Sequence, residues 1–195
     1  MLNFELFLII LVSYLFGSIP FGLLLTKIFL KKDIREIGSG NIGATNVLRS
    51  GNKILGYSTL VLDILKAVLP VLYIKFFMND YLYISSLSIF IGHVFPIWLK
   101  FKGGKGVASY LGILCCLDIF TALIFGAVWI SIFILFKFSS LSSLLASLTI
   151  PIFQFFYNSN SDYYFYFMMF ILIFFTHREN IKRLRNNTES KSKIY

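Results

Sequence analysis

Long apolar stretches separated by short polar segments make up almost the whole chain. A helix that crosses a bilayer needs about 20 consecutive apolar residues, and most of these stretches approach or exceed that length. The pattern therefore predicts an all-α, polytopic integral membrane protein. The stretches with few charges are residues 5–30, 54–77, 81–99, 107–136, 140–157 and 163–177.

The stretch 107–136 is too long for one crossing and has Asp118 near its middle. A single helix would place this carboxylate in the hydrocarbon core, at a cost of about 2.5–3.5 kcal/mol on insertion scales. A turn near Asp118 would bring it to the membrane surface instead, and this gives seven transmembrane helices. Five helices are the alternative, because the segment 107–117 is only about half a crossing long and is also compatible with a half-buried helix.

The composition agrees with a protein in lipid. Hydrophobic residues make up 57% of the chain and charged residues 14%, against about 45–50% and about 25% in soluble domains, and the mean hydropathy is +0.79. These values exclude a soluble enzyme, a disordered chain, a disulfide-rich secreted module and a nucleic-acid-binding domain.

The first apolar stretch has no basic segment before it and is longer than a signal-peptide core, so we expect it to remain as the first span. The adjacent Cys115 and Cys116 fit neither a metal site nor a structural disulfide and are predicted to be small core residues.

The basic residues predict the orientation in the membrane. Nearly all of the 18 Lys and Arg lie in alternate loops and in the C-terminal tail, whereas the intervening turns contain Asp80, Asp118 and Asp162. By the positive-inside rule the basic loops are cytoplasmic, so the N-terminus is outside and the C-terminus is inside. We expect one integral domain over residues 1–185 and a polar cytoplasmic tail over 186–195. The basic residues concerned are Lys27, Lys31, Lys32, Arg35, Arg49, Lys53, Lys100, Lys102, Lys105, Lys137, Arg178, Lys182, Arg183, Arg185, Lys191 and Lys193.

A first polar cluster, residues 38–49 (the first motif), lies in the first cytoplasmic loop. Its glycines allow positive φ and a close approach to a ligand, Ser39 and its neighbours offer neutral hydrogen-bonding groups, and Arg49 offers a planar set of donors. If a helix begins near Thr45, its N-terminal N–H groups add to the attraction for an anion. A flexible loop with a helix cap is the alternative. The residues predicted to bind substrate here are Gly40, Asn41, Gly43, Ala44, Thr45 and Asn46.

A second polar cluster, residues 92–106 (the second motif), ends in a glycine-rich loop after a span that Trp98 is expected to anchor at the interface. Its backbone amides and lysine ammonium groups suit a phosphate. It is not a nucleotide-binding phosphate loop, because the spacing differs and Val107 stands where Ser or Thr is required. His93 lies inside the membrane from this loop and is expected to be either a packed core histidine or a base. The residues predicted to bind substrate here are His93, Lys102, Gly103, Gly104 and Gly106.

A third polar cluster, residues 177–184 (the third motif), begins where the last span leaves the membrane. On a helix His177 and Asn180 are three residues apart and share a face, so they can address one bound group. A solvated helix end is the alternative.

Within the second span Asp63 and Lys66 are also three residues apart and are predicted to pair, either for function or to join helices.

The three motifs lie on the predicted cytoplasmic side and contain Gly, Ser, Asn, Lys, Arg and His without a pair of carboxylates. This combination predicts a site for phosphate-bearing ligands at the membrane surface. The sequence contains no nucleophile elbow, no His-x-x-x-x-Asp motif and no Cys/His metal arrangement, so we expect neither a metal nor another cofactor. A Ser39 nucleophile activated by His177 would lack an obvious carboxylate to orient the histidine.

Together, residues 38–49, 92–108 and 177–184 resemble the signature segments of the bacterial integral-membrane acyl-phosphate:glycerol-3-phosphate acyltransferase family. The resemblance implies a seven-helix enzyme of the bacterial inner membrane with its active site open to the cytoplasm. It also associates the glycines of the second motif with glycerol 3-phosphate. The catalytic residues that it implies are Ser39, Arg49, Lys105, His177 and Asn180. The chain departs from the family pattern at Ala67, Trp98, Ser109 and Asn187.

The implied reaction transfers a fatty acyl group from acyl phosphate to the 1-hydroxyl of sn-glycerol 3-phosphate, as the first step of bacterial phospholipid synthesis. The products are lysophosphatidic acid and inorganic phosphate. We expect direct transfer, with Arg49 and Lys105 offsetting the repulsion between the two phosphates. No nucleic acid is an expected partner, membrane lipid is the expected surrounding, and the sequence is compatible with a monomer. The alternatives are a transporter for a phosphorylated solute, which should show internal repeats or broken helices, and a non-catalytic membrane subunit.

Overall fold

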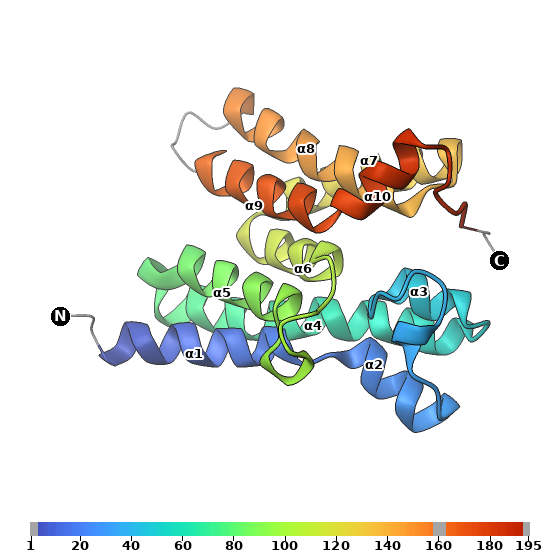
Figure 1. Ribbon diagram of the computed structural model, residues 1–195. Coiled ribbons are helices and arrows are strands. Elements are labelled where there is room, and N and C mark those ends of the chain that lie inside the picture. Colours follow the sequence, from blue (N-terminus) through green and yellow to red (C-terminus); the bar gives the residue numbers. More distant parts are fainter. Residues whose placement is uncertain (1–3, 158–162, 193–195) are drawn as a thin grey trace. The chain divides into compact units, whose positions relative to one another are not determined.

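The computed structural model describes residues 4–157 and 163–192 (Figure 1). Every regular element in these two ranges is a helix, which confirms the predicted all-α class. The chain forms two compact units, Met1–Leu117 and Asp118–Tyr195. The single domain expected over residues 1–185 stays a prediction, and each unit is described by itself.

The long helices coincide with the apolar stretches of the sequence. Four of the described helical segments are long and apolar enough to cross a membrane: Phe4–Leu30, Asn79–Leu99, Ile119–Phe136 and Ser139–Tyr157. Many large apolar side chains on the helices are exposed, as is expected for surfaces in contact with lipid. The number of crossings and the orientation of the chain stay predictions. The remaining long or apolar helices are α4 (Lys53–Phe77), α6 (Val107–Leu117) and α9 (Tyr163–Thr176).

The first unit is built on α1 (Phe4–Ser18), α4, α5 (Leu82–Val94) and α6. Helix α1 packs along α5, and α4 packs against both α5 and α6 (Figure 1). Helix α1 ends before Pro20, because a proline disfavours the helical conformation in the residue before it and has no N–H to donate. The shorter elements of this unit are α2 (Phe21–Leu25), a π-helical turn (Thr26–Leu30), α3 (Ala44–Arg49) and three 3₁₀ turns (Ile34–Glu36, Asn79–Tyr81 and Ile97–Leu99).

Small residues allow the helices of the first unit to approach closely. A Cβ atom at Gly17 in α1 would overlap the backbone carbonyl of Ile89 in α5. Across the same interface the hydroxyl groups of Ser13 and Ser85 form a hydrogen bond of 2.9 Å. Close packing and hydroxyl hydrogen bonds are the forces that join helices in lipid, where the hydrophobic effect does not favour helix association.

The long apolar stretch 107–136 is interrupted at Asp118, as predicted. Helix α6 ends one residue before Asp118 and α7 (Ile119–Phe136) begins one residue after it. The Asp118 carboxylate accepts hydrogen bonds from the backbone N–H groups of Phe120 (3.1 Å) and Thr121 (3.0 Å). The first N–H groups of a helix have no partner within the helix, so the carboxylate stabilises the start of α7 as an N-cap.

The two cysteines face different surroundings. Cys116 is buried and Cys115 is exposed. The prediction that both are core residues is therefore confirmed for Cys116 and wrong for Cys115. Consecutive residues of an α-helix point about 100° apart, and the side chain of Cys115 falls outside the face of α6 that is buried.

The second unit contains α7, α8 (Ser139–Tyr157), α9 and α10 (Arg178–Arg185), and α8 packs against α7 and α9. Polar side chains join α8 to α7. The Gln154 amide Nε2 donates to the Thr121 hydroxyl at 2.6 Å, and the Trp129 Nε1 donates to the Ser143 hydroxyl at 3.1 Å. These hydrogen bonds provide partners for polar groups that would be costly to expose to lipid.

The chain turns sharply after α10 at Asn187, whose φ is +56°. The N–H groups of Asn187 and Thr188 donate to the carbonyl groups of Leu184 (3.2 Å) and Arg183 (2.9 Å), which is the hydrogen-bond pattern of a Schellman motif. Asparagine is among the residues other than glycine that best tolerate this left-handed conformation. This explains how an asparagine can occupy a position at which the resemblance described above leads us to expect glycine.

We expect Gly17→Leu to destabilise the first unit, because the new side chain would overlap backbone atoms of α5. Overpacking of this kind costs about 1–3 kcal/mol, so the purified variant in detergent should unfold at a lower temperature than the wild-type protein. Gly126→Leu in α7 is the matched control, because a Cβ atom there meets no described atom within 4 Å. Equal unfolding temperatures for the two variants would contradict the close approach of α1 and α5.

Candidate functional site

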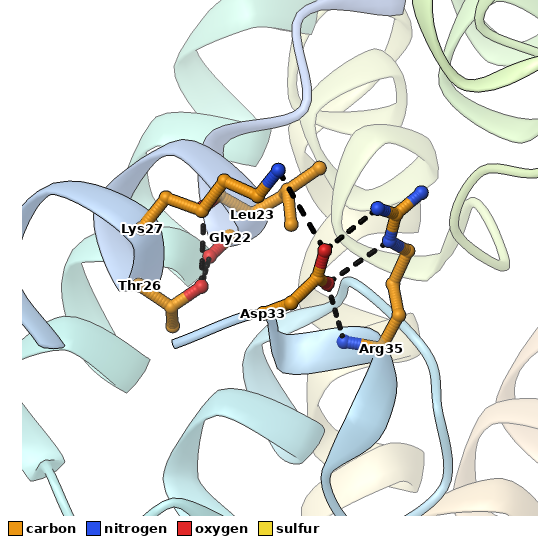
Figure 2. A network of polar contacts seen from close by, with 6 residues as sticks. All are labelled: Gly22, Leu23, Thr26, Lys27, Asp33 and Arg35. Carbon is orange, nitrogen blue, oxygen red and sulfur yellow. Dashed lines mark hydrogen bonds and ion pairs between the residues drawn. The ribbon is translucent and has the colours of Figure 1, made fainter. Parts of the chain in front are cut away.

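A polar network precedes the first motif. Figure 2 shows the Asp33 carboxylate between the side chains of Lys27 and Arg35. The Arg35 guanidinium donates to both carboxylate oxygens, at 2.9 and 2.6 Å, and the Lys27 Nζ lies 3.6 Å from Asp33 Oδ2. The hydrogen bond from Arg35 holds the pKa of Asp33 well below its usual range. The carboxylate is therefore ionised at neutral pH and caps the 3₁₀ turn that leads toward the first motif.

Asn46 holds the first motif in its folded form. Its buried amide Nδ2 donates to the carbonyl groups of Ile34 (3.1 Å), Ile37 (2.9 Å) and Asn41 (2.8 Å), and its Oδ1 accepts from the N–H of Ser39 (2.8 Å). Both N–H donors and one acceptor position of the amide are thus used by the backbone of the loop. The sequence predicts that Asn46 binds substrate, whereas these contacts give it a role in shaping the loop.

Ser39 and Arg49 lie near each other because of the backbone around Gly38. Gly38 and Gly40, on either side of Ser39, have φ values of +58° and +71°, which glycine adopts without steric cost. A Cβ atom at Gly38 would overlap the Asn46 amide and would lie 3.2 Å from Cδ of Arg49. The Arg49 side chain therefore passes beside the residue that precedes Ser39. Ser39 is exposed and Arg49 is partly exposed.

Helix α3 begins at Ala44, so the condition stated for the first motif, a helix that begins near Thr45, is met. Gly43 is the N-cap residue, and its N–H donates to the Asn41 side-chain oxygen at 2.9 Å. The side chains or backbone of Asn41, Gly43, Ala44 and Thr45 are all partly exposed. Arg49 is the last residue of α3, so the helix determines the position from which its guanidinium extends.

The glycine-rich loop of the second motif folds back over the end of α5. The N–H groups of Gly103 and Gly104 donate to backbone carbonyl groups of α5, both at 3.0 Å. A Cβ atom at Gly104 would overlap the imidazole of His93, and one at Gly106, whose φ is +85°, would overlap the ring of Phe90. Gly104 is therefore required by close packing against α5, and Gly106 both by this packing and by its backbone conformation.

The first and second motifs share one hydrophobic core within the first unit. Leu99, in the second motif, packs against a buried cluster that lies beneath the first motif. On the loop after Leu99, Lys102 is exposed and Lys105 is partly exposed. The segment that leads to Lys105 thus packs on the core of the first motif, whose helix α3 ends at Arg49. The buried members of the cluster are Leu23, Ile34, Ile42, Val47 and Leu55.

Charged and polar side chains are buried beneath the second motif. Asp63 and Lys66 of α4 form the predicted ion pair, with 2.7 Å between Asp63 Oδ1 and Lys66 Nζ. Lys66 Nζ also donates to the carbonyl group of Ile19 at 2.7 Å. His93 is only 3% exposed, and its Nδ1 lies 3.9 Å from Asp63 Oδ1. This burial agrees with the expectation that His93 is a packed core histidine.

In the second unit, His177 and Asn180 lie together at the start of α10 and are both buried. Nδ1 of His177 lies 2.8 Å from the carbonyl oxygen of Ile173. Because a carbonyl can only accept, Nδ1 donates, and Nε2 is the acceptor whenever the ring is neutral. The Asn180 Nδ2 donates to Glu189 at 2.8 Å, and within the described ranges its buried Oδ1 has no hydrogen-bond partner.

Glu189 is a partner of the third motif that the sequence did not reveal. Its carboxylate accepts hydrogen bonds from Asn180, from Arg183 (2.7 Å) and from Ser140 (3.0 Å). Burial alone would raise the pKa of Glu189, but the hydrogen bonds from Arg183, Asn180 and Ser140 outweigh this effect and the net shift is downward. The residue lies in a polar tail without hydrophobic periodicity, so no sequence pattern indicates that the tail returns to α10.

Comparison with known proteins gives one consistent result over the whole chain. The family model described as glycerol-3-phosphate acyltransferase matches residues 7–187. A glycerol-3-phosphate acyltransferase of Pelagibacter ubique (strain HTCC1062) is 64% identical over 98% of this chain and all of its own length. One of Mesorhizobium japonicum is 47% identical over 97% of both chains.

Two solved structures have the same fold. They are crystal structures of PlsY (YgiH), an integral membrane glycerol 3-phosphate acyltransferase, in its glycerol 3-phosphate form and its lysophosphatidic acid form. Their TM-scores are 0.90 and 0.87, and each is 36% identical to this chain. The likeness covers 96% of this chain and 95% of the other.

We expect Asn46→Asp to loosen the first motif, because a carboxylate cannot donate to the three carbonyl groups that the amide now serves. Each buried polar group left without a partner costs about 1–3 kcal/mol. Hydrogen–deuterium exchange of the backbone over residues 37–43 should therefore become faster. Asn186→Asp, at an exposed position, is the matched control. Unchanged exchange in the Asn46→Asp variant would contradict the role of the amide.

Proposed function

The chain belongs to the glycerol-3-phosphate acyltransferase family, and we propose that it transfers a fatty acyl group from an acyl phosphate to the 1-hydroxyl of sn-glycerol 3-phosphate. The products are lysophosphatidic acid and inorganic phosphate, and the reaction is the first step of bacterial phospholipid synthesis. The observation that supports this proposal most strongly is the likeness, over 96% of the chain, to an acyltransferase solved in forms with glycerol 3-phosphate and with lysophosphatidic acid.

The cationic side chains of the first unit suit two substrates that both contain phosphate. Two like unit charges about 4 Å apart repel each other by about 4 kcal/mol at an effective dielectric constant of about 20, so they require cations nearby. Arg49 and Lys105 provide them on two loops that share one core, and Lys102 adds a second ammonium group to the glycine-rich loop. Because the loops are anchored before substrate arrives, little reorganisation is needed during the reaction.

The chemistry requires few protein groups. The 1-hydroxyl oxygen attacks the carbonyl carbon of the mixed anhydride and forms the new ester bond, while the bond from that carbon to the phosphate oxygen breaks. The departing phosphate takes up the hydroxyl proton. An acyl phosphate is already activated, so neither an acyl-enzyme nor a side-chain base is needed, and holding the two substrates together provides much of the rate enhancement.

We assign the catalytic roles as follows. Arg49 and Lys105 neutralise the phosphates, and Ser39 and Asn180 orient a phosphate or the carbonyl group through hydrogen bonds. His177 accepts a hydrogen bond from the acceptor hydroxyl, which fits a neutral ring whose Nδ1 donates to the backbone. His93 and Asn46 act by holding their loops. The other residues proposed to contact substrate are Gly40, Asn41, Gly43, Ala44, Thr45, Lys102, Gly103, Gly104 and Gly106.

We propose that the chain crosses the bacterial inner membrane seven times, with its N-terminus outside and its C-terminus and active site on the cytoplasmic side. The helix break at Asp118 supports the number of crossings, because it divides the long stretch into α6 and α7. The concentration of Lys and Arg in alternate loops supports the orientation. The acyl chain would lie among the lipid-facing helices, and one copy of the chain contains all the side chains assigned above.

The donor can be tested with the purified protein in lipid, using labelled glycerol 3-phosphate and either palmitoyl phosphate or palmitoyl-CoA. We expect labelled lysophosphatidic acid with palmitoyl phosphate alone, because a direct transfer without a side-chain base needs an activated donor with a phosphate leaving group. Product formed only from palmitoyl-CoA would contradict the proposed donor. Binding of glycerol 3-phosphate without product from either donor would favour a transporter.

We expect Lys105→Met to lower kcat/KM by about 10²–10³-fold, the range seen when one preorganised electrostatic contact to the reacting groups is removed. Lys100→Met is the matched control, since it removes the same charge from an exposed position at the start of the same loop. Steady-state kinetics with palmitoyl phosphate should show a large loss only for Lys105→Met. Similar losses in the two variants would indicate a general effect of loop charge and would contradict the role of Lys105.

A further inference from the structure

The structure contains buried ionic groups that the proposed reaction does not use. Asp63 and Lys66 are 3% and 4% exposed and belong to the middle of α4. We infer that Asp63, Lys66 and His93 form a buried polar triad that fixes the first and second motifs relative to each other. The triad thereby sets the affinity for glycerol 3-phosphate. This inference rests on the proposed function, and it makes the three residues positioning residues that do not contact substrate.

The polar triad is connected to the second motif through His93. Nδ1 of His93 lies 3.9 Å from the Asp63 carboxylate and has no hydrogen-bond partner among the described residues. The other side of the ring lies against Gly104, where a Cβ atom would overlap Nε2. The carbonyl group of His93 also accepts the hydrogen bond from the Gly104 N–H at 3.0 Å. The position of the imidazole therefore determines where Gly104 and the following Lys105 can lie.

The polar triad is connected to the first motif through Lys66. Its Nζ donates to the carbonyl group of Ile19, in the short link between α1 and α2. Helix α2 begins two residues later, and its Gly22 lies so close to the first motif that a Cβ atom there would overlap the carbonyl group of Ile42. The ammonium group thus holds α2 in place, and α2 in turn supports the loop that contains Ser39.

An ion pair is not needed here for stability alone. Taking two charges out of water is costly, and replacing a buried pair by apolar residues is often neutral or stabilising, whereas removing one partner leaves an unpaired buried charge. A pair retained in a membrane helix therefore indicates a role in specifying a geometry. In this protein the two partners reach two different loops, so the geometry concerned is the spacing of those loops.

This argument predicts different results for single and double variants. Asp63→Leu and Lys66→Met should each unfold at a lower temperature, because each leaves one charged group buried without its counter-ion. The double variant Asp63→Leu with Lys66→Met, which replaces the pair by apolar residues, should recover most of the wild-type unfolding temperature but should show a KM for glycerol 3-phosphate raised about tenfold, because misplaced loops hold the substrate poorly. Lys75→Met is the matched control on the same helix, since Lys75 donates to the carbonyl group of Cys116 and reaches neither loop. It should keep the wild-type KM.

A double variant with the wild-type KM would overturn the inference, because the pair would then be only structural. His93 gives a second test that does not depend on the double variant. His93→Leu should raise KM for glycerol 3-phosphate, and His93→Asn, which keeps a side-chain N–H near Asp63, should restore part of the loss. A wild-type KM in His93→Leu would also overturn the inference. A wild-type protein without acyltransferase activity would instead count against the proposed function.

Discussion

A polar group in a lipid environment must find its partner within the protein, because an unpaired backbone or side-chain group there costs several kcal/mol. This constraint explains where the polar chemistry of the molecule lies. The Asp118 carboxylate caps the start of α7, the Gln154 amide is hydrogen-bonded between α8 and α7, and Lys66 pairs with Asp63 and a backbone carbonyl. The segments with exposed polar groups, including the first two motifs, lie in the connections between helices.

The same close packing that joins the helices also shapes the first and second motifs. Gly17 allows α1 to touch the backbone of α5, Gly22 allows α2 to touch the first motif, and Gly104 allows the second motif to lie on His93. At each of these positions the absence of a side chain lets the glycine backbone contact a neighbouring backbone or ring directly. A loop held by such contacts has few alternative positions, and a loop with few alternative positions can hold charged groups in place before substrate binds.

The sequence predicted the elements of the fold well and the details of the site less well. The long helices, the break at Asp118 and the Asp63–Lys66 pair follow from apolar length, from the cost of a charge in lipid and from helical spacing. The exposure of Cys115 did not follow, because lipid and protein interior are both apolar and hydropathy does not distinguish a helix face in contact with one from a face in contact with the other. The hydrogen bonds of Asn46 and Glu189 also did not follow. Each accepts or donates several hydrogen bonds with groups brought near only by folding, and an amide or carboxylate in a polar loop has no periodicity that reveals such partners.

We propose two roles for the cationic side chains of this protein, and the side chains with each role differ in how deeply they are buried. Lys66 is 4% exposed and is matched by Asp63, so salt screens its interaction weakly and the loop geometry that depends on it should be nearly independent of ionic strength. We propose that Lys102, which is exposed, and Lys105, which is partly exposed, attract phosphate, and this attraction is open to screening by salt. The proposal requires their exposure, because a buried ammonium group could not reach a substrate at the surface. The proposed reaction therefore needs both arrangements at once: paired charges inside the helices to hold the loops, and cations at the surface to bring two phosphates together.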